Sequence, residues 1–385
     1  MNTIKQLIEK YCPDGVEYKK LGEVCKTIPA PVKVKTSQYF KKGKYAIIDQ
    51  GQSKIAGYTN DEFILIPKGE YVLYGDHTCT VKYVNFRFAQ GADGLKILKT
   101  EQLLTKYLYY ALSNFNIKNN EYKRHWSIVK EIYIPVPPIS VQREIVRILD
   151  SFTSLEAELE AELEARRKQY EYYRDQLLSF KHLSGGGKNE VEWKTIKDVC
   201  LSICSGGTPN TQNKDFYNGN IPWLRTQEVD WKDIYKTDVL ITEAGLKNSS
   251  AKLIPANCVI VAMYGATAAK VAINKIPLTT NQACCNLQID ESICNNRYVY
   301  QWLCKNYEVL KAMGEGSQQN LNAKKIKNFP IPIPPLSTQR RIVSILDRFE
   351  SLVNDITTGL PAEITARHQQ YEYYRDQLLS FKRKS

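Results

Sequence analysis

The sequence contains near-duplicate copies of the same segments, and this repetition constrains its fold more than any other feature. Residues 136–152 read VPPISVQREIVRILDSF and residues 333–349 read IPPLSTQRRIVSILDRF, with 11 of 17 positions identical. The segment QYEYYRDQLLSFK occurs at residues 169–181 and again, unchanged, at residues 370–382. A third pair is VEYKKLGEVC, residues 16–25, and VEWKTIKDVC, residues 191–200. Repeated segments mark repeated structural units, so the chain is predicted to run as block, helix, block, helix.

Each copy of the Pro-Pro motif predicts the start of a long helix. The prolines stiffen an extended lead-in, Ser140 and Ser337 are expected as N-caps, and a proline-free stretch follows each serine. Apolar residues then recur mostly every three or four positions, from Ile145 to Leu177 and from Ile342 to Phe381. This spacing is typical of the seam of a coiled coil.

The two predicted helices differ in their middle parts. The first contains LEAELEAELEAR, residues 155–166, a tetrapeptide written three times with leucines at Leu155, Leu159 and Leu163. A period of four should locally relax a left-handed supercoil, and the glutamates are interpreted as a solvated face. The second carries Gly359-Leu360-Pro361, which predicts a break with Pro361 restarting the helix in its first turn.

The two blocks, residues 15–134 and 190–331, have no sequence resemblance to each other beyond their opening segments. Both contain short β-branched or aromatic runs bounded by turn residues, followed by a helical stretch, so each is predicted to be a small α/β domain of few short strands. The expected division is an N-terminal helix and first domain, a central helix and linker, a second domain and a C-terminal helix: residues 1–134, 135–190, 191–331 and 332–385. The run SGGGKN, residues 184–189, is predicted to be a flexible joint.

Length and composition narrow the class of protein. A chain of 385 residues suits two or three domains, and no run approaches the 18 apolar residues of a membrane span. The N-terminal segment lacks the pattern of a secretion signal, so a soluble, cytoplasmic protein with reduced thiols is expected. The ten cysteines lack the spacing of a metal site.

The net charge of +12 is unevenly distributed. Residues 1–134 carry +8, residues 135–190 carry −2, residues 191–331 carry +4 and residues 332–385 carry +2. The positive charge therefore lies mainly in the two blocks. It is compatible with binding to nucleic acid or to an acidic partner, and charge alone leaves the two open.

The sequence offers no catalytic constellation. It has no phosphate-binding GxxxxGK[ST] loop, no NPPY motif of adenine methyltransferases and no glycine-rich turn after a strand for a nucleotide cofactor. His77 and His125 lack a recognisable nucleophile or carboxylate partner and are interpreted as surface or contact residues. A non-catalytic chain that binds no cofactor and no metal is expected.

The duplicated PPxSxQRxIVxILDxF, its coiled-coil continuation and the two dissimilar blocks together resemble the specificity subunit of a type I restriction-modification enzyme. Further support comes from two block motifs, GDHTCTVKYVNFRFAQGADGLKIL in the first and SGGTPNTQ with GNIPWLRTQEV in the second. The resemblance covers nearly the whole chain. It implies a mixed α+β fold: two small target recognition domains separated by two long helices that form an antiparallel coiled coil, in a circular, pseudo-two-fold arrangement.

The resemblance also implies partners. Each target recognition domain would read one half of a split, asymmetric site in double-stranded DNA. The chain would assemble with two methyltransferase subunits, and with restriction subunits when DNA is cut, but not with a membrane. S-adenosylmethionine and ATP would be used by those partners. The recognised bases, the spacer length and the existence of a restriction subunit are left open.

The second block fits the family pattern better than the first. Residues 316–320, GSQQN, precede its Pro-Pro lead-in as expected, whereas the first block has Arg124-His125-Trp126-Ser127 at that place. Gln6-Leu7-Ile8 echoes Gln176-Leu177-Leu178 and Gln377-Leu378-Leu379, which predicts that the first helix docks beside the end of the chain.

An antiparallel pair of roughly 40-residue helices would be about 60 Å long and could act as a ruler between two DNA-reading domains. Lys and Arg would contact phosphates, and Arg, Lys, Gln and Asn would read base edges. The candidates in the first domain are Lys33, Lys35, Lys41, Lys42, Lys44, Gln50, Gln52, His77 and Arg87. The candidates in the second domain are Thr208, Asn210, Gln212, Arg225, Gln227, Lys270, Asn281, Gln282, Ser317, Gln318, Gln319 and Asn320.

Two rival classes stay open. A freestanding architectural DNA-binding protein would need no partner, whereas an enzyme acting on DNA would need an active site that the sequence does not show. Apolar residues left exposed on the helices, and on the domain faces toward them, would favour the partner-dependent class.

Overall fold

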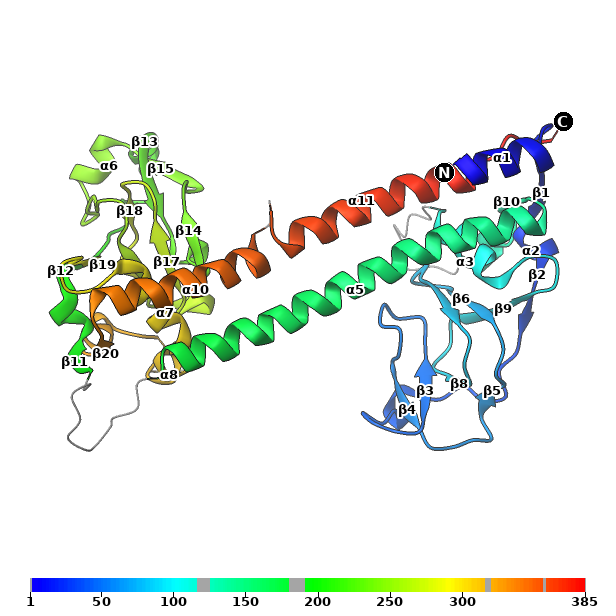
Figure 1. Ribbon diagram of the computed structural model, residues 1–385, viewed down its shortest axis with the longest axis horizontal. Coiled ribbons are helices and arrows are strands. Elements are labelled where there is room, and N and C mark those ends of the chain that lie inside the picture. Colours follow the sequence, from blue (N-terminus) through cyan, green and yellow to red (C-terminus); the bar gives the residue numbers. More distant parts are fainter. Residues whose placement is uncertain (1, 116–124, 180–190, 316–319, 356–357, 385) are drawn as a thin grey trace. The chain divides into compact units, whose positions relative to one another are not determined.

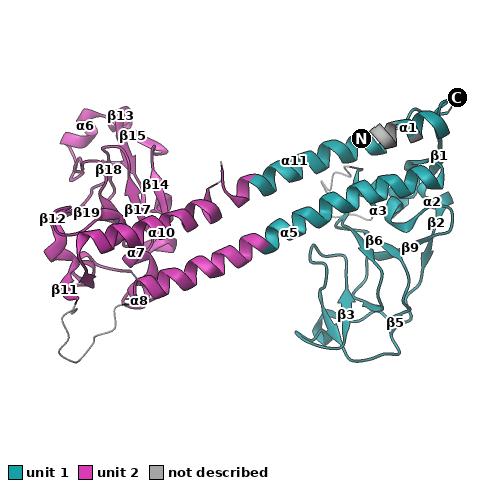
Figure 2. Ribbon diagram, viewed as in Figure 1, with its two compact units in different colours: residues 1–161, 363–385 teal, residues 162–362 magenta. Residues whose placement is uncertain are grey.

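The structure, a computed structural model, describes residues 2–115, 125–179, 191–315, 320–355 and 358–384 (Figure 1). The described chain forms two compact units (Figure 2): unit 1 comprises residues 1–161 and 363–385, and unit 2 comprises residues 162–362. The long helix α5 (Ile139–Leu177) contributes its first part to unit 1 and its last part to unit 2. No helix among the described residues is long and apolar enough to cross a membrane.

Unit 1 contains the first domain, here called domain 1. Its base is a two-stranded antiparallel ribbon of β1 (Glu17–Lys20) and β10 (Tyr133–Val136). The sheet next to it contains, in spatial order, β2 (Cys25–Ile28), β9 (Leu95–Thr100), β6 (Tyr71–Gly75) and β7 (Val81–Val84), all antiparallel. The other sheet contains β4 (Gly57–Thr59), β3 (Tyr45–Ile48), β8 (Phe88–Gln90) and β5 (Leu65–Ile66), with β3 and β8 parallel. The helices of unit 1 other than α5 are α1 (Asn2–Tyr11), α2 (Leu21–Val24), α3 (Thr105–Ser113), α4 (Trp126–Val129) and α11 (Leu360–Leu379).

Unit 2 contains domain 2, whose base is the antiparallel ribbon of β11 (Glu192–Thr195) and β20 (Pro330–Ile333). Its larger sheet contains β12 (Cys200–Ser205), β19 (Cys284–Ile289), β16 (Val259–Ala262), β17 (Val271–Asn274) and β14 (Lys232–Ile234). Its smaller sheet contains β15 (Val239–Ile241), β13 (Tyr217–Leu224) and β18 (Thr279–Thr280), with β13 and β18 parallel. The helices of unit 2 other than α5 are α6 (Glu243–Lys247), α7 (Asn296–Lys305), α8 (Tyr307–Ala312), α9 (Ala323–Lys327) and α10 (Leu336–Asn354).

The two domains have the same core topology. The order β2-β9-β6-β7 in domain 1 corresponds to β12-β19-β16-β17 in domain 2, and β4-β3-β8 corresponds to β15-β13-β18. The two blocks, which have no sequence resemblance beyond their opening segments, therefore share one backbone topology. The prediction of few strands in each block is wrong. Different side chains can satisfy the same order of short apolar runs and turns, so the sequence comparison did not reveal the shared fold.

The central strands are apolar along their whole length because both faces of the sheet are covered. All four residues of β16 are buried. In domain 1, Leu73 of β6 faces the second sheet, where it packs with Phe88, whereas Tyr74 belongs to the cluster formed with α3 and α5. Each domain therefore has four layers: sheet, sheet, short helix and long helix.

A buried tyrosine ties the short helix of each domain to the strand before the long helix. The hydroxyl of Tyr107 in α3 donates to the carbonyl of Pro135 at 3.0 Å, and the hydroxyl of Tyr298 in α7 donates to the carbonyl of Pro332 at 3.0 Å. Both side chains are fully buried, so each hydroxyl needs its partner. The repeat thus preserves a contact as well as a sequence pattern.

The structure confirms the break in the second helix. Helix α10 ends at Asn354 and α11 begins at Leu360, which places Pro361 in the first turn of α11, where its missing N–H costs nothing. The predicted serine caps are wrong: α5 begins at Ile139 and α10 at Leu336, so Ser140 and Ser337 lie inside the helices. The carbonyls of Pro138 and Pro335 instead accept the first helical hydrogen bonds.

Two equivalent buried glutamines hold the start of each long helix against its domain. The side chain of Gln142 donates to the carbonyl of Pro137 at 2.8 Å and accepts from the N–H of Leu104, the residue before α3, at 2.9 Å. Gln339 donates to the carbonyl of Pro334 at 2.8 Å and accepts from the N–H of Asn295, the residue before α7, at 2.8 Å. One amide therefore joins two helix N-termini in each unit.

In each unit the repeated phenylalanine stacks on a repeated tyrosine. Phe152 of α5 stacks on Tyr374 of α11 with ring centroids 5.3 Å apart, and Phe349 of α10 stacks on Tyr173 of α5, also at 5.3 Å. In unit 1, Glu156 of α5 also lies 2.7 Å from His368 of α11. From the Phe152–Tyr374 stack to this contact, residue numbers rise along α5 and fall along α11. The helices of this pair are therefore antiparallel.

The two ends of the described chain bind each other in unit 1. The N–H of Val16 donates to the carbonyl of Lys382 at 2.9 Å, and the N–H of Lys384 donates to the carbonyl of Val16 at 2.9 Å. Gly15 has a φ of +93°, and a Cβ there would collide with the carbonyl of Lys382. Ile8 of α1 packs against the cluster that contains Leu378 and Leu379. The prediction that the first helix docks beside the end of the chain is confirmed.

We predict that Gln339→Ala lowers the free energy of unfolding by about 2 kcal/mol, because the N–H of Asn295 and the carbonyl of Pro334 would lose their partner in a buried site. Urea denaturation of the purified chain measures the change. Gln369→Ala, at an exposed position of α11, is the matched control and should change stability by less than about 0.5 kcal/mol. Equal denaturation midpoints for the two variants would contradict the role assigned to Gln339.

Candidate nucleic-acid interface

In each domain, loops from distant parts of the sequence meet where the parallel strand pair ends. We call this the loop edge. In domain 1 it comprises residues 29–36, 49–53, 76–80, 91–94 and 125. In domain 2 it comprises residues 206–213, 225–228, 263–269, 281–283 and 320. Because β3 and β8 are parallel, as are β13 and β18, the loops that follow them emerge side by side.

Gln50 connects the loops of the edge in domain 1. Its side-chain oxygen accepts from the N–H of His77 at 3.1 Å, and its side-chain nitrogen donates to the carbonyl of Asp93 at 3.2 Å. Its backbone carbonyl accepts from the hydroxyls of Thr78 at 2.5 Å and Thr80 at 2.6 Å. These contacts fix the relative positions of three loops.

A buried lysine supports the loop that carries Gln50. The ammonium of Lys82 in β7 donates to the carbonyls of Asp49 at 2.8 Å and Ser53 at 2.7 Å. Burial lowers the pKa of Lys82, and the nearby Asp49 carboxylate partly opposes this shift. The ammonium group of Lys82 thus binds backbone carbonyls on the inner side of the loop. Other side chains can occupy the outer face of the loop.

The second domain builds its edge in a similar way. The N–H of Asn281 donates to the carbonyl of Leu224 at 2.9 Å, which joins the loops that follow β18 and β13. The hydroxyl of Thr267 donates to the carbonyl of Thr226 at 2.8 Å, and the hydroxyl of Thr208 donates to the side-chain oxygen of Gln282.

One backbone contact is shared by the two edges. The N–H of His125 donates to the carbonyl of Asp76, one residue after β6, at 2.9 Å, and the N–H of Leu321 donates to the carbonyl of Met263, one residue after β16, at 2.8 Å. The structure therefore supports the sequence correspondence between His125 and the segment that ends at Asn320.

The structure brings only some candidates of domain 1 together. Lys33, Lys35, Gln50, Gln52 and His77 lie at the loop edge, where Lys33 pairs with Asp93 at 2.5 Å.

Four cations lie away from that edge. Lys44 and Arg87 directly precede β3 and β8, at the opposite end of the parallel pair, where both cations lie over the ring of Tyr45. Lys41 and Lys42 are exposed in the loop that leads to β3.

The candidates of domain 2 divide in a similar way. Those at the loop edge are Thr208, Asn210, Gln212, Arg225, Gln227, Asn281, Gln282 and Asn320. The side chain of Lys270 instead pairs with Asp230 at 2.7 Å and lies over the ring of Trp231. Ser317, Gln318 and Gln319 lie outside the described residues. Which of these residues touch DNA stays a prediction.

The guanidinium of Arg225 is held by two carboxylates. It lies 3.7 Å from Glu228 and 3.6 Å from Asp238, with about a third of the side chain exposed. A guanidinium presented in this way can exchange its exposed carboxylate partner for a base edge or a phosphate.

Sequence reasoning missed the residues that support the loops, Asp76, Lys82 and Glu228. Asp76 accepts from the N–H of Trp126 at 2.7 Å, and its side chain is nearly buried. The signal was the Gly75-Asp76-His77 turn directly after an all-apolar run, where a turn carboxylate often binds backbone N–H groups.

The repeated leucines lie on α5. Leu159 is buried, whereas Leu155 and Leu163 are half-buried. Glu162 and Glu164 pair with Arg166 and Lys168 four residues along the helix, consistent with a solvated glutamate face.

All ten cysteines are free thiols. Burial raises the pKa of Cys200, Cys258, Cys285 and Cys294 to about 12, so these groups are protonated at neutral pH. In the part of the chain that the structure describes, no group of three or more His, Cys, Asp or Glu side chains could hold a metal ion.

Two mixed domains of one topology, each attached to a repeated helix, define the chain as a double copy of one structural module. The chain belongs to the family described as type I restriction modification DNA specificity domain, whose model matches residues 13–165 and 188–366. It is 38% identical over 393 residues to the type I restriction enzyme EcoR124I/EcoR124II specificity subunit of Escherichia coli, with 96% of this chain and 95% of that protein covered.

Solved structures share the fold. The S subunit of a type I restriction-modification system from M. genitalium matches with a TM-score of 0.61 at 15% identity, over 95% of this chain and 96% of that one. A structure described under complex assembly and conformational transition of the type I R-M system matches with a TM-score of 0.59 at 16% identity, over 95% of this chain and 97% of that one. The predicted mixed fold and the predicted family are confirmed.

We predict that Lys82→Met speeds hydrogen exchange in residues 49–53 by roughly tenfold, because the loop loses two hydrogen bonds to a charged donor. Hydrogen exchange followed by mass spectrometry measures the effect. Lys68→Met, at an exposed position of the same domain, is the control and should leave the loop unchanged. Unaltered exchange in both variants would show that Lys82 does not support the loop.

Proposed function

We propose that this chain is the non-catalytic DNA specificity subunit of a type I restriction-modification complex, in which each domain reads one half of a bipartite, asymmetric site. The observation that carries the proposal is the loop edge, which is built twice on the same topology but with different side chains. Two loop edges that have the same geometry but carry different polar side chains suit two half-sites of different sequence.

The chemistry of the edges suits a duplex. Gln, Asn and Arg side chains can pair with the edges of adenine and guanine in the major groove. Exposed cations such as Lys33 and Lys35 can contact phosphates, and the positive charge of both domains would attract DNA from a distance. Of the candidates in domain 2, Arg225 combines both capacities with partial exposure.

The repeat also suggests how many partners bind. Five positions of the identical segments are exposed in both copies: Glu171 and Glu372, Tyr172 and Tyr373, Asp175 and Asp376, Gln176 and Gln377, and Ser179 and Ser380. Tyr172 and Tyr373 are each 60% exposed. Packing within the chain therefore does not explain why both positions carry a tyrosine. Exposed tyrosines at equivalent positions are typical of interface anchors, which favours two copies of one partner.

In this proposal the partners are two adenine methyltransferase subunits, joined by restriction and translocase subunits where a system has them. S-adenosylmethionine and ATP are then used by these partners, and the complex works in the cytoplasm on double-stranded DNA. The helices, paired as a coiled coil, set the distance between half-sites, with the tetrapeptide repeat at Leu155, Leu159 and Leu163 as the adjustable segment.

Exchange of residues 15–134 for the corresponding block of a relative tests the proposal. We expect methylome sequencing of cells that carry the chain and its methyltransferase to show one half of the methylated site replaced and the other half retained. Each domain reads its own half, so the halves should change independently. Replacement of both halves, or methylation without a bipartite site, would contradict the proposal.

The number of partners has a separate test. The intact chain should bind two methyltransferase subunits, whereas Tyr172→Ala or Tyr373→Ala should weaken one of the two sites by roughly tenfold or more, as expected for an interface tyrosine. Native mass spectrometry at a limiting partner concentration separates the 2:1 from the 1:1 complex. Tyr235→Ala, at an exposed position of domain 2, is the control. If the variant with both Tyr172→Ala and Tyr373→Ala still forms the 2:1 complex, this surface is not where the methyltransferase subunits bind.

A further inference from the structure

Arg297 of α7 joins a strand of domain 2 to the long helix beneath it. Its guanidinium lies 3.2 Å from Asp233 in β14, 2.8 Å from Asp347 in α10 and 3.0 Å from Glu350 in α10. Only 17% of the side chain is exposed. A buried cation with three carboxylates from two elements is costly to rearrange, so it fixes the strand relative to the helix.

Strand β14 has no counterpart among the described residues of domain 1. In domain 2 it is the edge strand of the larger sheet, parallel to β17, whereas the matching sheet of domain 1 ends at β7. Asp233 is held from the domain side by Lys275 at 3.3 Å, as well as by Arg297. The added strand therefore supplies an additional attachment of the domain to the helix.

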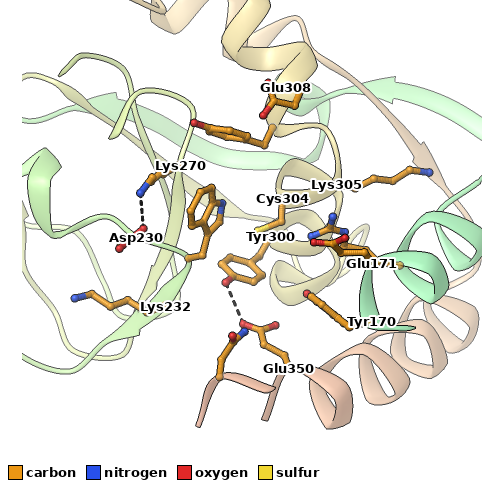
Figure 3. A pocket seen from close by; sticks show the side chains of 14 residues that line it. Tyr170, Glu171, Asp230, Lys232, Lys270, Tyr300, Cys304, Lys305, Glu308 and Glu350 are labelled. Atoms are coloured by element: carbon orange, nitrogen blue, oxygen red, sulfur yellow. Dashed lines mark hydrogen bonds and ion pairs between the residues drawn. The ribbon is translucent and has the colours of Figure 1, made fainter. Parts of the chain in front are cut away.

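An open cavity of about 830 Å³ lies beside this attachment, wholly within unit 2 (Figure 3). Residues 230–232, which end in the first residue of β14, line it together with Tyr170 and Glu171 of α5 and with Glu350. Figure 3 shows the hydroxyl of Tyr300 directed at Glu350, with a distance of 3.1 Å. The strand itself is anchored in domain 2 by its pairing with β17 and by the buried Ile234. The ion pair between Asp233 and Arg297 therefore links an ordered strand to α7 and, through Asp347, to α10.

The equivalent attachment in unit 1 is simpler. Asp150 occupies the repeat position of Asp347 and accepts from Lys106 of α3 at 2.6 Å and from the hydroxyl of Tyr110 at 2.7 Å. The side chains of Lys106 and Asp150 are both more than a third exposed. An exposed pair of this kind contributes little to rigidity.

We propose that the Arg297–Asp233 contact is a positioning device that sets the register of the second half-site, and so makes the complex strict about spacer length. The inference rests on the proposed function, because it concerns how that function is tuned. Arg297 and Asp233 act through the orientation of domain 2 on α10 and need not touch DNA. Domain 1, with its single exposed pair, contributes less to this strictness.

Asp233 is the better position for a test than Arg297. Removal of the guanidinium would leave three carboxylates together near a buried site, and the chain could fail to fold. Asp233→Ala removes only the strand side of the contact and leaves Arg297 with Asp347 and Glu350. Asp233→Asn keeps a hydrogen-bond acceptor without the charge and should restore part of the effect.

The experiment uses the full chain with its methyltransferase subunits and reads the methylome at single-base resolution. For Asp233→Ala, methylation at sites with a spacer one base pair longer or shorter should rise about tenfold relative to cognate sites, with both half-site sequences unchanged. A tenfold change corresponds to about 1.4 kcal/mol of lost discrimination. Glu291→Ala, an exposed carboxylate of the same domain, is the matched control and should match the unmodified chain.

A chain with one additional LEAE tetrapeptide after residue 166 serves as the positive control for a changed spacer. If Asp233→Ala keeps the strict spacer, or loses methylation evenly at all sites, the contact is only structural and the inference is overturned. If the unmodified chain directs no bipartite methylation, the proposed function itself fails. The two failures are therefore distinguishable in one data set.

Discussion

The architecture depends on satisfying a buried amide at the start of each long helix. Gln142 and Gln339 each bind a carbonyl on their own Pro-Pro lead-in and an N–H at the start of the short helix of the domain. An amide that offers both a donor and an acceptor can join two helix N-termini at once, where an apolar side chain would leave two buried polar groups without partners. The docking of both domains on the helices follows from this junction.

The same junction explains how domains of different sequence can share one attachment. The side-chain amide of each glutamine and the hydroxyls of the fully buried Tyr107 and Tyr298 form their hydrogen bonds with backbone atoms and not with other side chains. Side chains elsewhere in the domain can therefore vary while the attachment stays the same. The glutamines and tyrosines of the junction do not belong to the loop edges. Variation at those edges changes the polar groups on display without altering the fold.

Much of the helical frame could be predicted because its signals are local. Apolar spacing gave the long helices, and Pro361 gave the restart of α11. The serine caps were mispredicted because the proline carbonyls at Pro138 and Pro335 begin the helices two residues earlier, and the sequence does not distinguish the two arrangements.

The domain fold and the loop edges were harder to predict. Strands of two to eight residues carry weak patterns, and their order depends on distant pairings. On residue type alone, Lys270 was grouped with Arg225 as a candidate for DNA contact. In the structure the side chain of Lys270 instead contacts Asp230 and Trp231.

The pairing of Val16 with Lys382 and Lys384 has a consequence for biosynthesis. Unit 2 is one continuous stretch, so all of its residues leave the ribosome before the last residues of unit 1 do. Unit 1 is made first but is complete only when the last residues, including α11, have left the ribosome. The domain translated second can therefore reach its native contacts before the one translated first, which reverses the usual N-to-C order of folding.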